Sequence, residues 1–368
     1  MNESLPQDIQ KNNTAAPETE QAAPETAAPG TDAQKPPEPA WKKTLKFVIR
    51  FGVSAGILTY LICTRDIKWQ DFKLVKPWCI VVAFFAVYTQ LSLTAIRWFT
   101  LLRAAGVKCS FREAFSLQMQ GMFFSQFLPG GSVGGDVVKA GILATRTPPG
   151  GKFNVVFSIF VDRLCGLGSL LIALLGTCLI CHDTIARFPE GARHGLLVMC
   201  TVCGALLCVV IFVFFSDLLY KVKFFKFFLD IADRITKDTF KRAADAVALY
   251  RRCWKLLLGW IAATTLVFFP ILSLPVWVMA NGFEGAPHRD FLPCLMISNV
   301  SQTIAAIPGS FGGTGTRDIA CAEMMTAMGF TDTESGVIPI LVTMVTLLVA
   351  LSCSVFFIFD RGKRAPKA

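Results

Sequence analysis

Two Pro-Gly motifs interrupt apolar sequence at distant points of the chain. They occupy residues 128–139 (LPGGSVGGDVVK) and residues 307–318 (IPGSFGGTGTRD). Each follows an apolar run that carries amide side chains, and each places charged residues beside a helix start. Such a break cannot face lipid, because its backbone N–H and C=O groups would lack partners there. Two breaks in corresponding positions predict a site built from interrupted helices. Ordinary loops between spanning helices are the alternative interpretation.

The remaining apolar runs predict a polytopic, all-α membrane protein. Hydrophobic residues make up 53% of the chain, and the mean hydropathy is +0.53. Runs of this length and composition are typical of membrane-spanning helices. Pro270 and Pro275 predict kinks in the fifth run. The expected spans are residues 45–62, 78–96, 155–181, 196–215, 256–280 and 337–359.

Charge is unevenly distributed along the chain. Residues 1–40 contain seven acids and two bases and have almost no large apolar side chains, which predicts a disordered tail. The rest of the chain is strongly basic, as expected of cytoplasmic loops and anionic leaflets, so we expect no nucleic-acid partner. The connection 217–255 contains ten Lys and Arg residues, against two in 183–195 and one in 281–290. Both termini are therefore predicted to be cytoplasmic.

This orientation divides the membrane region into two halves. Residues 41–195 and 196–360 would each supply three spans and one re-entrant, broken helical segment, followed by a basic tail at 361–368. Because three is odd, the halves insert with opposite orientation, which is an inverted repeat. Within the second half, residues 217–255 include an amphipathic helical pattern. Either a helix on the cytoplasmic leaflet or a solvated helix packed on the membrane domain fits this pattern.

The cysteines and histidines have weaker implications. Cys178 and Cys181 lie in one apolar run, and Cys200 and Cys203 in the next. Their spacing is compatible with a zinc site or a disulfide, although helix packing is the favoured interpretation. We therefore predict no metal site and no cofactor. The histidines, His182, His194 and His288, all fall in predicted external connections.

Charged residues also occur inside the third span. Asp162 and Arg163 lie there, and Asp162 shares a helical face with Asn154, Ser158 and Ser169. Ionisable groups at this depth normally face a bundle interior or a cavity. A structural Asp–Arg or Asp–Lys pair is one interpretation, and a hydrophilic cleft for a polar ligand is the other.

Together these features predict a phosphate-binding site. Glycine-rich turns at helix starts present N–H groups and the positive end of the helix dipole. Lys139, Arg163 and Arg317 add cations that suit phosphate. The nearby acids could balance these cations or bind an amine. The candidate binding residues are Gly130, Gly131, Ser132, Gly134, Gly135, Asp136, Lys139, Asp162, Arg163, Pro308, Gly309, Gly312, Gly313, Thr314, Gly315, Arg317 and Asp318.

The chain resembles the flippase-like membrane region of lysylphosphatidylglycerol synthetases, the bacterial multiple peptide resistance factor family, and its stand-alone relatives. The resemblance covers roughly residues 42–360. It rests on Arg97-Trp98 with Leu101-Leu102, on 127–136, on 161–164 and on 307–318. It implies a bacterial inner-membrane protein that moves a modified phospholipid between leaflets. Asp318 stands where the family pattern leads us to expect Glu. The soluble synthetase domain is expected to be absent, which leaves glycolipid and isoprenoid-linked substrates open.

Three functions follow from these features. The favoured one is a flippase-like protein, not an enzyme, that translocates an anionic or aminoacylated phospholipid or a related lipid-linked substrate. The second is a membrane scaffold that binds a separate lipid-modifying synthetase through its basic loop. The third is a membrane-embedded head-group transferase or hydrolase that uses Asp136 and Asp162, although the histidines lie away from the motifs. No G-x-x-x-x-G-K-[ST] nucleotide-binding loop is present.

Overall fold

The computed structural model describes residues 56, 59–60, 62–65, 67–127, 131–148, 151–215, 249–250, 252–306 and 315–360. Within these ranges every regular element is a helix, and an isolated β-bridge pairs Val75 with Phe283. Four predicted features lie wholly or mostly outside them: the tail 1–40, the span 45–62, the amphipathic part of 217–255 and the basic tail 361–368. The centres of both Pro-Gly motifs, residues 128–130 and 307–314, also lie outside.

Five described stretches are long and apolar enough to cross a bilayer. The prediction of a polytopic helical protein is therefore confirmed. A short 3-10 helix, η1 (Trp69–Leu74), precedes the first of them. The five stretches are Pro77–Ala104 (α2), Lys152–Ile180 (α5), Glu190–Cys208 within α7 (Glu190–Phe215), Trp254–Asn281 (α10 Trp254–Ala263, η4 Thr264–Phe268 and α11 Phe269–Asn281) and Asp332–Phe359 (α14 Asp332–Ser352 with α15 Ser354–Asp360).

The fourth stretch changes its helical geometry near Pro270. The segment Thr264–Phe268 is a π-helical turn, and Pro270 follows it at the start of α11. Proline has no N–H to donate to the carbonyl four residues earlier, so the regular α-helical bonding cannot continue through it. Single π-helical turns inside α-helices are frequent at functional sites. Here the turn directs Thr264 and Phe268 toward the cavity described below.

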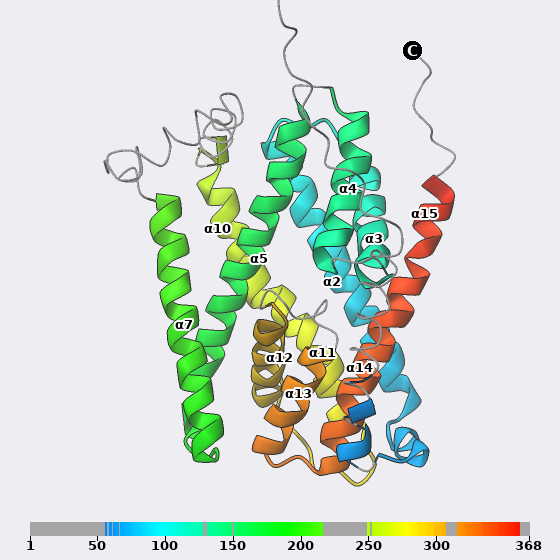
Figure 1. The fold of residues 1–368 in the computed structure, drawn as a ribbon, viewed down its shortest axis with the longest axis vertical. Coiled ribbons are helices and arrows are strands. Elements are labelled where there is room, and N and C mark those ends of the chain that lie inside the picture. The colour runs from blue at the N-terminus through cyan, green and yellow to red at the C-terminus, as the bar shows by residue number, and fades with distance from the viewer. Residues whose placement is uncertain are drawn as a thin grey trace, which may run out of the picture. The chain divides into compact units, whose positions relative to one another are not determined.

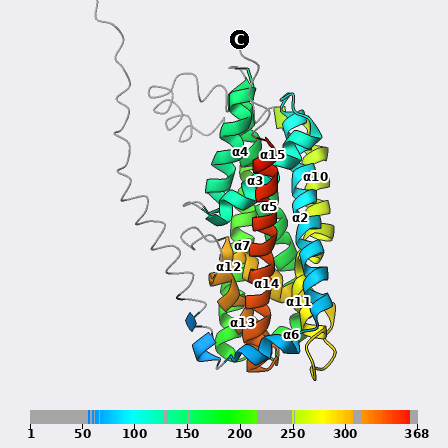
Figure 2. The ribbon, with the colours of Figure 1, turned by 90° about the vertical axis from the view of Figure 1, so that its right-hand side faces the viewer.

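Two pairs of shorter helices complete the unit. The first pair is α3 (Phe111–Phe127) with α4 (Ser132–Arg146), and the second is α12 (Phe291–Ala305) with α13 (Thr316–Ala327). At a rise of about 1.5 Å per residue, each is roughly 18–26 Å long, shorter than the ~30 Å hydrocarbon core. The α3–α4 pair lies toward one end of the helical unit and the α12–α13 pair toward the other (Figures 1 and 2).

The first pair depends on a close approach between two glycines. A Cβ atom added to Gly135 would overlap the carbonyl oxygen of Gly121, so α4 can lie against α3 here only with glycine at position 135. Gly131 precedes α4 with a φ of 59°, and Gly315 precedes α13 with a φ of 91°. Both are left-handed conformations that favour glycine. A glycine of the corresponding Pro-Gly motif therefore lies immediately before each helix.

Two apolar clusters hold these elements together. One joins α2, α11, α12, α13 and α14 around Ala83, Met279 and Ile297. The other joins α2, α3, α4, α5 and α10 around the fully buried Trp98 and Leu117. By contrast, α7 packs along α5 and exposes much of its apolar surface, as expected of a lipid-facing helix (Figure 1).

Candidate functional site

A cavity of about 800 Å³ lies between the two short helix pairs. Its wall includes Gln126 and Ser132, on either side of residues 128–130 in the sequence, and Ala306 and Arg317, on either side of residues 307–314. Residues of α2, α5, η4, α11 and α14 complete the wall. Residues of both Pro-Gly motifs, almost 180 positions apart in the sequence, therefore border the same space.

Asp136, in the first turns of α4, is the centre of one charged group. Its Oδ1 lies 3.0 Å from Lys139 Nζ, and its Oδ2 accepts a hydrogen bond of 2.6 Å from Arg163 Nε. Lys139 also donates to Gln118 Oε1 at 3.1 Å and lies 4.7 Å from the Trp98 ring centroid. These contacts surround the ammonium group, whose side chain is 2% exposed. Lys139 therefore holds α3, α4 and α2 together rather than standing free in the cavity.

Asp162, on α5, belongs to a second charged group. Arg97 on α2 donates from Nε to Asp162 Oδ1 at 2.8 Å and from Nη1 to Thr264 Oγ1 at 3.2 Å. The arginine and aspartate side chains are both buried, at 8% and 4% exposed. A buried charge is tolerated when it is paired and hydrogen-bonded, as it is here. The structural Asp–Arg pair considered from the sequence is therefore present, and it also forms part of the cavity wall.

Asp318 forms the third group at the start of α13. Its Oδ1 accepts from Arg317 Nη2 at 3.1 Å, and both of its oxygens lie 2.8 Å from Thr343 Oγ1 on α14. The Gly315 N–H donates to Asp318 Oδ2 at 3.2 Å, and Arg317 also donates to Thr343. Asp318 thus accepts a backbone N–H at the N-terminus of α13, where a negative charge is favoured, and it holds the side chain of Arg317 in place.

The accessible cations differ from the buried ones. The Arg163 side chain is 53% exposed and that of Arg317 is 18% exposed. These two arginines come from different halves of the chain. The buried cations, Lys139 and Arg97, have their donors directed at protein acceptors. A ligand entering the cavity would therefore meet the two arginines first.

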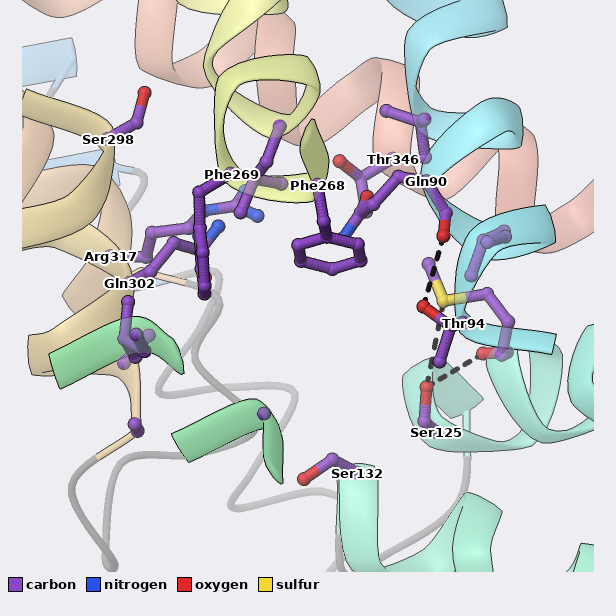
Figure 3. A pocket seen from close by; sticks show the side chains of 18 of the residues that line it. Gln90, Thr94, Ser125, Ser132, Phe268, Phe269, Ser298, Gln302, Arg317 and Thr346 are labelled. Carbon is purple, nitrogen blue, oxygen red and sulfur yellow. Dashed lines mark hydrogen bonds between the residues drawn. The ribbon is translucent and has the colours of Figure 1, made fainter. Parts of the chain in front are cut away.

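Neutral polar groups occupy much of the remaining wall. They include Gln90, Thr94, Gln126, Ser298 and Gln302. Figure 3 shows Gln302 and Arg317 close together on one side and Gln90 and Thr94 on the other. In this view the ring of Phe268 lies between the two groups (Figure 3). The cavity thus combines charged and amide groups with an apolar surface to which η4 and α11 contribute Phe268, Phe269 and Leu272.

The structure brings together some of the residues singled out from sequence and not others. Gly131 and Gly315 stand at helix starts beside the cavity, whereas Gly134 and Gly135 lie inside α4, where Gly135 serves helix packing. Six candidates lie outside the described residues: Gly130, Pro308, Gly309, Gly312, Gly313 and Thr314. The candidates that line the cavity are Ser132, Asp136, Lys139, Asp162, Arg163, Arg317 and Asp318.

The polar face expected along the third span is divided between two roles. Ser158 accepts from Trp98 Nε1 at 3.2 Å, and Asn154 donates to the Ala105 carbonyl at 3.0 Å. Ser169 donates to the carbonyls of Cys165 and Ile261. These contacts dock α5 on α2 and α10. Of this face, Asp162 and the adjacent Gly166 reach the cavity.

Sequence reasoning missed several lining residues. Arg97 directly follows the expected span 78–96, but α2 continues to Ala104, and Arg97 is buried within it. Its pairing with Asp162 is a contact across 65 positions that local pattern does not reveal. Gln126 and Gln302 had a signal, since amide side chains in apolar runs before a break are unusual. No local sequence pattern indicates that Gln90 and Thr264 line a cavity.

The cysteines and histidines lie away from this cavity. Cys178, Cys181 and Cys203 are buried where α5 packs on α7, with Cys200 half-buried beside them. All four are free thiols, and the described residues contain no group of three or more potential metal ligands. His182, His194 and His288 are exposed, outside the cavity wall. Cys178, Cys181, Cys200 and Cys203 contribute to the apolar cluster between α5 and α7.

These features define a polytopic helical membrane protein with a charged cavity between two short helix pairs. A comparison with known protein families matches residues 47–353 to the family described as "Lysylphosphatidylglycerol synthase TM region". The chain therefore belongs to this family, which confirms the resemblance found in the sequence. Comparisons with curated proteins and with solved structures return no match.

Proposed function

We propose that this protein translocates an anionic or aminoacylated phospholipid, or a related lipid-linked substrate, between membrane leaflets. The head group would pass through the cavity while the acyl chains stay in the bilayer. The observation that supports this most strongly is the cavity itself. Its volume of about 800 Å³ falls within the range of small-ligand sites, and its wall includes residues of both Pro-Gly motifs.

The path across the membrane follows from the two helix pairs. The α3–α4 pair would re-enter from one face and the α12–α13 pair from the other, as an inverted repeat. Their lengths and their positions at opposite ends of the unit support this arrangement (Figures 1 and 2). The strongly basic connection 217–255 supports a cytoplasmic location for both termini. The protein would be a multi-pass component of a bacterial inner membrane.

The phosphate would be held by Arg163 and Arg317. They are the most exposed of the four cations in the cavity wall, and each comes from a different half of the chain. A guanidinium group presents several donors in a plane that matches phosphate oxygens. The partner acids, Asp136 and Asp318, fix the two guanidinium groups. Moving a phosphate from one arginine to the other would carry it between the two halves.

Leaflet exchange in reconstituted vesicles tests this proposal. The protein would be incorporated with an acyl-labelled phosphatidylglycerol, and a membrane-impermeant reductant would bleach the outer leaflet. We expect the wild type to expose nearly all the label. Arg163→Gln and Arg317→Gln should each slow exchange about tenfold, the loss expected for a charge-assisted hydrogen bond.

Arg103→Gln is the matched control, because Arg103 is exposed and lies outside the wall of this cavity. It should exchange lipid at the wild-type rate. Exchange by the Arg163 and Arg317 variants at the wild-type rate, with normal insertion, would contradict the assignment of the phosphate site. A wild-type protein that leaves half the label protected would contradict translocation.

A further inference from the structure

Each acid in the described wall of the cavity already has a basic partner from the protein. Asp162 pairs with Arg97, and Asp318 pairs with Arg317. Asp136 pairs with two cations, Lys139 and Arg163. An amine on a lipid head group would therefore have to displace one of these partners. At the buried Arg97–Asp162 pair, that exchange would leave a buried cation without its acid, which is costly.

The charges in the wall do not cancel. Four bases and three acids line the cavity, which gives a formal surplus of one positive charge among the described residues. Residues 128–130 and 307–314, the remaining parts of the two Pro-Gly motifs, contain no ionisable side chain. One phosphodiester would neutralise the surplus. A phosphodiester head group that also carries one ammonium group has no net charge, so the surplus of one positive charge would remain. A head group with two ammonium groups would increase that surplus.

The neutral groups of the wall suit hydroxyls. The side-chain amides of Gln90, Gln126 and Gln302 are half-buried and have no described protein partner. The Ser298 hydroxyl is buried without a partner among the described residues. An amide offers both a donor and an acceptor, as does each hydroxyl of a polyol. These groups would therefore satisfy a head group rich in hydroxyls better than one that ends in a cation.

We propose that the cavity selects a monoanionic lipid whose phosphodiester carries a neutral, polyhydroxylated head group, and that it discriminates against head groups with a free amine. Glycerol, inositol and sugar head groups share this chemistry. The inference rests on the proposed function, because it names the substrate class of the same cavity. Arg163 and Arg317 bind the phosphate, and Gln126 and Gln302, one from each short helix pair, bind the hydroxyls.

A panel of lipids tests the selectivity in two measurements. The full chain would be placed in vesicles with acyl-labelled phosphatidylglycerol, phosphatidylinositol, phosphatidic acid, phosphatidylethanolamine or lysylphosphatidylglycerol, and exchange would be measured for each. The same lipids would compete for binding to the protein in nanodiscs, read by native mass spectrometry. We expect phosphatidylglycerol and phosphatidylinositol to exchange and bind about tenfold better than the two amine-bearing lipids.

Two variants locate the selectivity in the cavity. Gln126→Leu and Gln302→Leu keep the side-chain volume close but remove the amide, so the preference for phosphatidylglycerol over phosphatidic acid should fall about fivefold in each. An unchanged preference would overturn the role given to the amides.

The outcomes separate the two proposals. Equal or faster exchange of an amine-bearing lipid would overturn the inference while leaving translocation intact. Selective binding of the polyol lipids with no exchange of any lipid would support the inference and contradict translocation. Binding that favours an amine-bearing lipid would overturn the inference whether or not exchange occurs.

Discussion

Arg97 donates a hydrogen bond from Nε to Oδ1 of Asp162 across 2.8 Å, and this contact ties α2 to α5 beside the cavity. Both side chains are almost fully buried. Asp162 carries the only carboxylate that this guanidinium contacts in the described structure. The pair therefore stabilises the packing of α2 against α5 as well as lining the cavity. A substitution at Asp162 should lower the stability of the protein, and any loss of transport would follow from that.

Asp162→Asn should accordingly destabilise the protein by about 3–5 kcal/mol, because it leaves a buried cation without its acid. The double variant Arg97→Gln, Asp162→Asn removes both charges together and should recover most of that loss. Thermal unfolding in detergent, followed by intrinsic fluorescence, would measure both. A double variant as unstable as the single one would show that the ion pair is not what Asp162 contributes.

Thr343 should be important for the start of α13. Thr343→Val keeps the shape of the side chain but removes the hydroxyl that contacts both oxygens of Asp318. We expect a loss of about 1–3 kcal/mol, since Asp318 is buried and would lose one of its partners. Thr346→Val is the matched control one turn along α14, where the hydroxyl donates to the Val342 carbonyl of its own helix. If both variants unfold at the same temperature, the Asp318 contact is not stabilising.

The close approach of α3 and α4 makes a third prediction. Gly135→Ala should cost about 1–3 kcal/mol, because its Cβ would overlap the Gly121 carbonyl and force the two helices apart. Gly141→Ala is the matched control, because Gly141 lies in the same helix and a Cβ added there would meet no neighbouring atom within 4 Å. It should be neutral or stabilising by up to about 1 kcal/mol, as expected for alanine in a helix. Unfolding temperatures of the two variants would compare them directly, and a stable Gly135→Ala protein would contradict the packing described.

Much of the helical architecture could be predicted from the sequence, because long apolar runs have few alternatives in a membrane. The similarity of the two Pro-Gly motifs also predicts charged residues near both breaks. Asp136, Arg163 and Arg317 do line one cavity. What local pattern could not supply were contacts between distant segments. Lys139 carries the charge expected of a phosphate ligand, yet Trp98 and Gln118 bury it.

The glycines show the same limit. From their spacing alone, Gly134 and Gly135 were expected to belong to the phosphate-binding turn. In the structure α4 begins at Ser132, so both are helical, and Gly135 is needed for the approach to Gly121. A glycine that permits a turn and a glycine that permits close packing look alike in one sequence. Only the position of the neighbouring helix distinguishes them.

The orientation proposed from charge makes a fourth prediction. A reporter protein fused after His288 should lie on the outer face of the membrane, whereas one fused after Arg361 should lie in the cytoplasm. The connection 281–290 contains one basic residue, and 217–255 contains ten, which sets this orientation. Paired phosphatase and fluorescent-protein fusions report the two locations. Fusions that both report the cytoplasm would contradict the proposed topology.

Photo-crosslinking with a phospholipid that carries a photoreactive group in its head tests most directly whether a head group occupies the cavity. The labelled peptides would be identified by mass spectrometry after vesicles containing the full chain are illuminated. We expect labelled residues in both α4 and α13, which contribute Ser132 and Arg317 to the same wall, and less labelling in the Arg163→Gln, Arg317→Gln double variant. Labelling confined to the exposed surface of α7, and unchanged in the double variant, would contradict it.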